Sequence, residues 1–231
     1  MTDKSYGQFC PVAMAAEIIC PRWTLVLLGE MLSGSTRFNE IKRGVPRMSP
    51  ALLSKRLKEL EAAGIVERVN GAGGMPEYHM TERGRDLHPI IKSIGGWAQK
   101  WIDTDVAMEK LDVKLLMWNM RRNLNANPMP RRRSVIQIIY PELPATLKNW
   151  WLIVEPDGEV DLCSLDPAYN VDLYISADLK AMTKAWMGHA SLADEIEAET
   201  ITLTGDPTLA STIGTWIGSS GLAGAYVPTP A

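Results

Sequence analysis

The stretch SPALLSKRLKELEAAGIVERVNGAGGMPEYHM, residues 49–80, decides the fold of the N-terminal part of this chain. Ser49 suits the N-cap of a helix and Pro50 its first position, where a missing N–H costs little. The apolar residues that follow recur at helical spacing on one face, at Leu53, Leu57 and Leu60. Gly64 then suits the end of the helix, so these residues predict one amphipathic helix between Ser49 and Gly64.

A β-hairpin is predicted directly after this helix. Residues 65–69 and 77–80 have strand character and flank the glycine-rich turn at 70–74. Thr81 suits the N-cap of a long helix behind the hairpin. Three helical segments precede the amphipathic helix, over 11–20, 21–34 and 37–42. Three short helices, a two-faced helix and a hairpin, in this order, are typical of a winged-helix domain.

The charges are distributed unevenly along the chain. Residues 1–102 carry 14 Lys and Arg against 10 Asp and Glu, whereas residues 103–231 carry 10 against 17. The full chain has a net charge of −3, but contact with phosphates depends on local basic surface and not on the whole-chain sum. The basic N-terminal part is therefore the part expected to meet nucleic acid.

The outward face of the helix after Ser49 is small, polar and basic, which suits the major groove of DNA. Short side chains near the start of a helix let its backbone approach base edges, while lysines and arginines around it hold phosphates and fix the register. The candidate DNA-binding residues are Arg37, Arg47, Met48, Ser49, Pro50, Ser54, Lys55, Lys58 and Arg68. Taken without the rest of the pattern, the lysines of this helix indicate only a solvated face.

Several motifs occur in a fixed order over residues 8–102: CPV at 10–12, RWTL at 22–25, RFNEI at 37–41, the helix 49–60, GIVER at 64–68, and Tyr78 with Thr81 and Gly84. In this combination the N-terminal part resembles the HxlR family of winged-helix regulators. The resemblance implies a homodimer, with the first and last helices of this region at the interface, and palindrome-like operator sites in double-stranded DNA. One departure is Cys20-Pro21, where the family more often has small residues, and this affects the entry into the second helix.

Cys10 lies where some HxlR-type regulators have a thiol sensor. The resemblance implies a redox-sensing role through thiolate oxidation beside a helix N-terminus. The alternative is that Cys10 is a small buried hydrophobic residue. Cys20 and Cys163 are interpreted as structural.

The rest of the chain has a different character. Strands are predicted over 134–140, 150–154, 159–164, 171–176 and 200–204, with helices that begin at Asp178 and Asp206. Runs of strands followed by helices are typical of an α+β domain. We therefore expect a winged helix-turn-helix domain at 1–102, a linker with an amphipathic helix (111–124) at 103–133, and an α+β domain at 134–231. The linker's Arg131-Arg132-Arg133 is either solvated or in contact with DNA phosphates that flank the operator.

Short motifs in this second region, VDLYIS at 171–176 with Asp178-Leu179, WMG at 186–188 and ITLTGDPTLA at 201–210, resemble the sterol-carrier-protein-like fold. The resemblance implies a tunnel for an acyl chain or a similar apolar molecule. Ligand pockets are mostly apolar and aromatic. The candidate lining residues are Trp150, Trp151, Met182, Trp186, Met187 and Trp216, and the alternative for each is an ordinary core position.

Several classes of protein are not supported by the sequence. Motifs of the types Gly-x-Ser-x-Gly and His-Glu-x-x-His and a phosphate loop are missing, so we expect no enzyme and no cofactor. The three cysteines are too scattered for a disulfide framework or a metal site. The N-terminus is polar and no apolar run approaches a bilayer span, so we expect a cytoplasmic protein without membrane contact.

The leading hypothesis is a dimeric DNA-binding transcriptional regulator, a repressor, whose C-terminal domain senses an apolar small molecule. A second hypothesis is a lipid-binding or scaffolding protein whose winged helix mediates dimerisation or protein contact. An enzyme that acts on an acyl substrate is a third class, disfavoured because a nucleophile and base in a suitable arrangement are missing.

Overall fold

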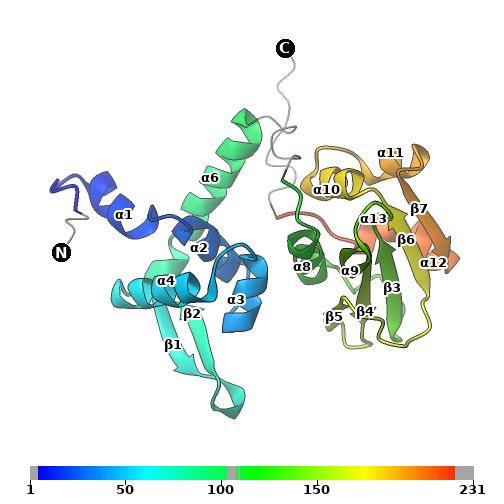
Figure 1. Ribbon diagram of the computed structural model, residues 1–231, viewed down its shortest axis with the longest axis horizontal. Coiled ribbons are helices and arrows are strands. Elements are labelled where there is room, and N and C mark those ends of the chain that lie inside the picture. The colour runs from blue at the N-terminus through cyan, green and yellow to red at the C-terminus, as the bar shows by residue number, and fades with distance from the viewer. Residues whose placement is uncertain (1–4, 103–107, 109, 222–231) are drawn as a thin grey trace. The chain divides into compact units, whose positions relative to one another are not determined.

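The computed structural model describes residues 5–102, 108 and 110–221, and it divides the chain into two compact units, Met1–Gly95 and Gly96–Ala231 (Figure 1). Each unit has its own hydrophobic core. Among the described residues, no single helix is long and apolar enough to span a membrane; one pair of helices, bent by 78° at the break between them, reaches that length and composition together.

The first unit is a set of helices followed by a hairpin. The helices before the hairpin are α1 (Pro11–Ile19), α2 (Thr24–Leu32), α3 (Phe38–Gly44) and α4 (Pro50–Ala62). The hairpin consists of the antiparallel strands β1 (Val66–Asn70) and β2 (Pro76–Met80), with the 3-10 turn η1 (Ala72–Gly74) at its tip. Behind it come α5 (Glu82–Arg85) and α6 (His88–Trp101), the second of which runs across the boundary between the units. This order confirms the predicted winged helix-turn-helix fold.

The core of the first unit lies between α2, α3, α4 and the hairpin. The predicted stripe on α4 is buried, with Leu53, Leu57 and Leu60 each at most 2% exposed. The other buried members are Leu27, Leu28, Met31, Ile41, Val45, Met48, Ile65, Val66 and Met80. Because this stripe is anchored, the opposite face of α4 must point outward.

Two helix boundaries differ from the sequence-based expectation. Pro21 does not open the second helix; Thr24 N donates to Pro21 O, and Trp23 lies in the left-handed region (φ 78°) before α2 begins at Thr24. The long helix expected from Thr81 is divided into α5 and α6. Thr81 still caps α5, with its Oγ1 accepting from Gly84 N at 3.1 Å. Gly84 packs directly on the carbonyl of Ile65, where a Cβ has no room.

The second unit is an α+β domain around one five-stranded sheet. Its strands are β3 (Ser134–Ile139), β4 (Asn149–Val154), β5 (Val160–Cys163), β6 (Leu173–Ala177) and β7 (Ile201–Gly205), in the order β5-β4-β3-β6-β7. The pair β3–β6 is parallel and the other pairs are antiparallel. Its helices are α8 (Val113–Asn123), α9 (Ala145–Lys148), α10 (Leu179–Met187), α11 (Leu192–Glu197), α12 (Pro207–Ser211) and α13 (Ile213–Trp216).

The helix α8 belongs to the core of the second unit, which changes the expected linker at 103–133. Leu116, Met117 and Met120 of α8 are buried in the same cluster as the inward residues of the sheet. Arg121 Nε also donates to Val160 O of β5 at 2.7 Å. The amphipathic pattern correctly predicted a helix. Its apolar face packs into the core of the second unit, so this helix is part of that unit and not of a linker.

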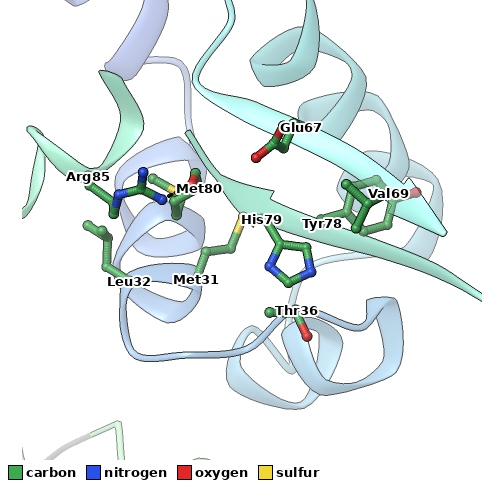
Figure 2. A pocket seen from close by; sticks show the side chains of 9 residues that line it. All are labelled: Met31, Leu32, Thr36, Glu67, Val69, Tyr78, His79, Met80 and Arg85. Carbon is green, nitrogen blue, oxygen red and sulfur yellow. Dashed lines mark hydrogen bonds between the residues drawn. The ribbon is translucent and has the colours of Figure 1, made fainter. Parts of the chain in front are cut away.

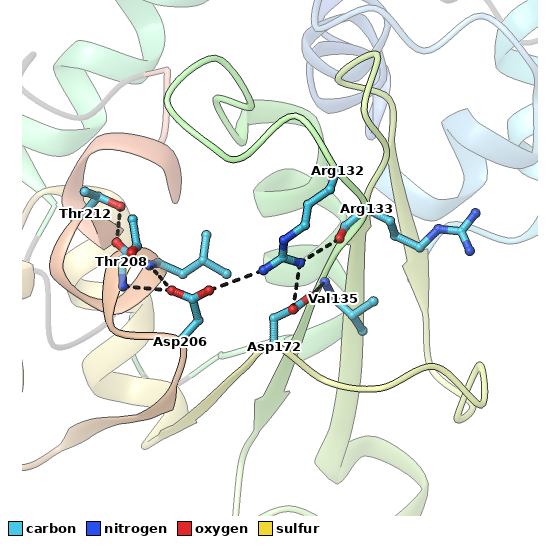
Figure 3. Close-up of polar contacts among 8 residues, drawn as sticks. Arg132, Arg133, Val135, Asp172, Asp206, Thr208 and Thr212 are labelled. Carbon is cyan, nitrogen blue, oxygen red and sulfur yellow. Dashed lines mark hydrogen bonds and ion pairs between the residues drawn. The ribbon is translucent and has the colours of Figure 1, made fainter.

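The three arginines at 131–133 were expected to be solvated or to contact DNA, and two of them are engaged inside the second unit (Figure 3). Arg132 Nη1 donates to Asp172 Oδ1 at 2.7 Å, and Arg132 Nη2 donates to Asp206 Oδ2 at 3.3 Å. Arg133 forms an ion pair with Glu155 and lies over the ring of Tyr169. These side chains fasten neighbouring segments of the unit.

Both acidic partners of Arg132, Asp172 and Asp206, also accept hydrogen bonds from backbone N–H groups. Asp172 Oδ2 accepts from Val135 N at 2.8 Å, which ties the start of β6 to β3. Asp206 Oδ1 accepts from Thr208 N and Leu209 N and so caps α12. These two backbone N–H groups, Leu209 first, hold the pKa of Asp206 below its usual value. The Gly-Asp-Pro motif at 205–207 is therefore a structural junction.

Candidate nucleic-acid interface

The outer face of α4 is the part of the first unit best suited to enter a groove. Ser49 Oγ accepts from Leu52 N at 3.3 Å, and Pro50 follows at the first helical position. Lys55 and Lys58 are exposed on the side opposite the buried leucines, and Ser54 is half-buried beside them. Neither lysine forms an ion pair within the described chain, so both charges remain available.

Met48 is a correction to the predicted interface. Its side chain is 1% exposed and belongs to the core, whereas the neighbouring Arg47 and Ser49 are exposed. Met48 N donates to Val45 O in the turn before α4, and this turn directs Met48 inward. A side chain buried in this way cannot contact a base, so Met48 supports the reading helix from within.

Arg37 is held by the hairpin. It lies at the N-cap of α3 and forms an isolated antiparallel bridge with Glu77 of β2. Arg37 Nε donates to Glu77 Oε1 at 3.3 Å, and His79 Nε2 lies 3.0 Å from Glu77 Oε2. These two partners, His79 first, hold the pKa of the Glu77 carboxyl below its usual value. The arginine remains largely exposed and is tied to the hairpin at the same time.

The hairpin offers little positive charge. Arg68 is exposed on β1, opposite Tyr78, but residues 70–76 at the tip include no Lys or Arg. Gly71 packs against the side chain of Glu77, which would have to shift to admit a Cβ, and Gly73 and Gly74 have positive φ. Glycine therefore shapes the tip, and the basic residue that the hairpin offers for phosphate contact is Arg68 on β1.

A shallow depression of about 470 Å³ lies between the end of α2 and the hairpin (Figure 2). Charged groups at its rim include Glu67 and Arg85, and Arg85 Nη1 is already bonded to Met80 O at 2.7 Å. The other lining residues are Met31, Leu32, Thr36, Val69, Tyr78, His79 and Met80. The depression is open and of mixed polarity, and it was not anticipated from the sequence.

The six residues predicted to line an apolar pocket do not line one cavity together, and four of them, Trp150, Met182, Trp186 and Trp216, belong to the core of the second unit. Trp150 and Trp216 are buried in the core of the second unit and donate their indole N–H groups to Leu147 O and Leu209 O. Trp151 follows Trp150 on β4 and therefore lies on the other face of the sheet. Met187 is only packed against the core.

Two of the six, Met182 and Trp186, do line a cleft of about 190 Å³. The other residues of its lining are Ala185, Leu192, Gly214, Ile217, Gly218 and Ser219. Most of these are small or belong to short segments without a periodic pattern, so no sequence signal pointed to them.

Cys10 is exposed at the N-cap of α1, not buried. The backbone N–H groups of Ala13 and Val12 lower the pKa of its thiol, whereas burial and the nearby Asp161 raise the pKa of the Cys163 thiol. All three cysteines are unpaired, and Cys20 is also exposed. Within the described residues there is no group of three His, Cys, Asp or Glu side chains that could hold a metal ion.

A row of large apolar side chains is exposed on α6: Ile90 (47%), Ile94 (43%), Trp97 (61%) and Trp101 (65%). The helix α1 likewise has no buried residue, and Val12 and Met14 are exposed on it. The apolar side chains of α6 thus lie mainly on the surface, and only Ile91 among them packs against the core of the first unit. Such contiguous apolar surface is typical of an interface with another protein.

Comparison with known proteins places these features in a family. The HxlR-like helix-turn-helix family matches residues 18–106. The HTH-type transcriptional regulator YvaP of Bacillus subtilis (strain 168) is 39% identical over 100 residues, which are 42% of this chain and 93% of YvaP. YdeP of the same strain is 35% identical over 105 residues, 44% of this chain and 82% of YdeP. These relatives are named as transcriptional regulators and not as enzymes, in agreement with the expectation from the sequence.

Solved structures give matches of the same extent. The redox regulator HypR in its reduced form is 34% identical, over 44% of this chain and 100% of HypR, with a TM-score of 0.38. The transcription factor PA1607 is 27% identical, over 42% of this chain and 69% of its own, with a TM-score of 0.41. The family match ends at residue 106, ahead of the sheet of the second unit. Through its N-terminal part, this chain belongs to the HxlR-like helix-turn-helix family.

Proposed function

We propose that this protein is a dimeric DNA-binding transcriptional repressor whose second unit senses an apolar small molecule. The observation that carries the DNA-binding part is the outer face of α4, where Lys55 and Lys58 are exposed and without ion pairs beside a Ser49-capped start. An α-helix fits the major groove, and its first turns approach base edges. The regulatory function named for the family relatives supports the same role.

The residues divide into two roles. Ser49, Pro50, Ser54 and Lys55 face the bases from the first turns of α4, while Lys58 with Arg37, Arg47 and Arg68 holds phosphates around it. Phosphate contacts fix the register, and base contacts supply specificity. Arg37 is positioned for this by its bond to Glu77.

The dimer forms through the apolar surface of α6 together with α1. Burying a row of two isoleucines and two tryptophans that are each about half exposed removes apolar area from water, which is the main driving force of association. A two-fold interface uses the same surface on both copies, and a two-fold dimer reads a palindrome-like operator.

A titration of the full chain on its own upstream DNA tests the DNA-binding part. We expect a shifted complex at moderate salt that survives an excess of unrelated competitor DNA, because specific binding exceeds non-specific binding by orders of magnitude. If unrelated competitor DNA at the same concentration as the upstream DNA abolished the shifted complex, sequence-specific binding would be contradicted. Retained dimerisation with no DNA complex would favour a lipid-binding or scaffolding protein that uses the winged helix for contact with protein.

The sensing part rests on the resemblance of short sequence motifs at 171–210 to the sterol-carrier-protein-like fold and on an apolar cleft in the second unit. A ligand changes operator affinity only if it binds the two states of the dimer with different affinity. In the second unit, α8 is bonded to the sheet through Arg121, and Asn125, just after α8, donates to Trp216 O at 2.8 Å. A ligand-induced movement of α13 would thus be transmitted to the end of α8 through this hydrogen bond.

Thiol sensing at Cys10 is a second candidate mode of regulation. The thiol is exposed, and the N–H groups at the start of α1 lower its pKa, which favours the reactive thiolate at neutral pH. Oxidation of the purified protein by hydrogen peroxide should change DNA affinity in the wild type and not in Cys10→Ser. Equal responses of the two proteins would remove Cys10 from the mechanism.

A further inference from the structure

The side chain of Glu77 on β2 joins three parts of the first unit. Its Oε1 accepts from Arg37 Nε at 3.3 Å, at the start of α3, and its Oε2 lies 3.0 Å from His79 Nε2. Gly71, at the base of the hairpin tip, packs against the same side chain. Because only 18% of the Glu77 side chain is exposed and both of its oxygens are engaged, it has little freedom to move.

The backbone around this side chain is fixed as well. The segment before α3 lies along the edge of β2 that β1 does not occupy. Tyr78 N donates there to Thr36 O at 2.8 Å, and Arg37 and Glu77 form an isolated antiparallel bridge. On its other edge β2 pairs with β1. The hairpin and the start of α3 are therefore one hydrogen-bonded piece, from which the Arg37 side chain extends.

Arg37 is held through one part of its guanidinium group. Its Nε is bonded to Glu77, whereas no hydrogen bond joins either Nη group to a residue that the structure describes. The side chain of Arg37 is 58% exposed. Arginine presents a planar fork of N–H groups that fits a phosphate, and the two Nη groups remain available for this contact.

Glu77 has two effects on DNA binding, and they have opposite signs. Its carboxylate lies next to any phosphate that Arg37 holds, so its charge alone weakens binding to every DNA sequence. A long side chain such as Arg37 also loses rotamer freedom when it binds, and a bond that holds it in place beforehand removes part of that cost. A fixed arginine meets a phosphate well in one register on the duplex, so this second effect favours the operator over unrelated DNA.

We propose that Glu77 is a positioning residue that raises the specificity of this protein for its operator by holding Arg37 in place, although its own charge disfavours DNA. This inference rests on the proposed DNA-binding function. It goes beyond that function because it assigns a share of the specificity to an acidic residue that makes no contact with a base. The sequence alone gives no sign of the pair, since the two residues are 40 positions apart.

Fluorescence anisotropy of the full chain on two duplexes of equal length, one from its upstream DNA and one unrelated, tests the proposal. Glu77→Ala should bind the upstream duplex about three- to tenfold more weakly than the wild type does, as the loss of one pre-ordered side chain allows. It should bind the unrelated duplex at least as tightly as the wild type does. Upstream binding by Glu77→Ala that equals or exceeds that of the wild type would overturn the proposal.

Glu67→Ala is the matched control. It removes the same charge from β1, at an exposed position that has no ion pair with a described residue. This variant should not weaken binding to the upstream duplex. Equal weakening by Glu67→Ala and Glu77→Ala would show that the bond to Arg37 is not the cause, and would also overturn the proposal.

A double-mutant cycle connects the effect to Arg37. In an Arg37→Ala background, Glu77→Ala should no longer weaken binding to the upstream duplex, because the side chain that Glu77 positions is gone. Equal weakening in both backgrounds would mean that Glu77 acts by another route, against the proposal. Should Glu77→Ala fail to fold, Glu77→Val takes its place, since valine suits a strand better and also lacks the acceptor.

The failure of this inference is distinguishable from the failure of the proposed function. If the wild type prefers the upstream duplex and Glu77→Ala has the same preference, only the role of Glu77 is refuted. If the wild type forms no complex with either duplex, the DNA-binding function itself is refuted, and the role of Glu77 with it.

Discussion

The candidate functional sites of the two units differ in how deeply their residues are buried. In the first unit the proposed contacts with DNA lie on the exposed face of one helix, α4, whose other face is anchored by leucines. In the second unit the apolar cleft is formed by three short elements, and most of the side chain of Trp186, one of its lining residues, is buried. A function on one helix face follows from periodicity, whereas a cleft depends on how separate segments pack.

The strongest way to test the separation of the units is to damage one core. Leu57 is 1% exposed in the first unit, and Leu57→Ala should lower the unfolding free energy of that unit by about 2–5 kcal/mol. Peptide-resolved hydrogen–deuterium exchange should show faster exchange in residues 5–95 with little change in 110–221. The exposed Lys58→Ala should change stability by no more than about 0.5 kcal/mol. Equal loss of protection in both units would mean that they unfold together.

The next largest effect is expected from the surface of α4. Replacing Lys55 and Lys58 by Ala should weaken operator binding by about ten- to a hundredfold, since each lysine contributes a base or phosphate contact. The slope of log affinity against log salt should become shallower by about 1, because only Lys58 of the two is assigned to a phosphate. Fluorescence anisotropy at several salt concentrations measures both quantities. The charge-matched double variant Lys110→Ala/Lys114→Ala, at two exposed positions of the second unit, should bind as the wild type does. Equal weakening by this variant would show that only net charge matters.

A smaller effect is expected at the arginine junction of the second unit. Arg132→Ala removes the bonds to Asp172 and Asp206 and should destabilise this unit by about 1 kcal/mol, since the pair is half-exposed. Thermal unfolding, followed by hydrogen–deuterium exchange of peptides from residues 110–221, measures this loss of stability. Since the folded-state pKa of Asp206 is lowered, its stabilisation is present above the unfolded pKa of about 3.9 and lost as pH falls through the folded value. A second unit that gains stability below about pH 4 would contradict this assignment.

The smallest effect concerns two of the three thiols, Cys10 in the first unit and Cys163 in the second. The lowered pKa of Cys10 and the raised pKa of Cys163 predict that alkylation by iodoacetamide reaches half its maximal rate at lower pH for Cys10 than for Cys163. Mass spectrometry of each cysteine peptide over a pH series measures the two profiles. In the urea-denatured chain the profiles should converge, and a folded protein with identical profiles would refute the difference.

Prediction from sequence was accurate where one element decides the outcome. The α4 stripe, the hairpin, the capping by Ser49 and Thr81, and the five strands of the second unit were all predicted, because each follows from local spacing and turn chemistry. Met48 was assigned to the DNA interface because the sequence of a turn does not say which neighbour points inward. The tryptophans of the second unit were grouped by residue type, and alternation along β4 puts Trp150 and Trp151 on opposite faces.

The sequence by itself determined the winged helix, its family and the basic face of α4, because a periodic helix and its caps contain the information locally. Only the tertiary structure decided three further points. It assigned α8 to the second core, engaged Arg132 and Arg133 with acidic partners, and brought Trp186 and Ile217 together at one cleft. Each of these depends on contacts between residues far apart in the chain, and these contacts arise from packing and not from local preference.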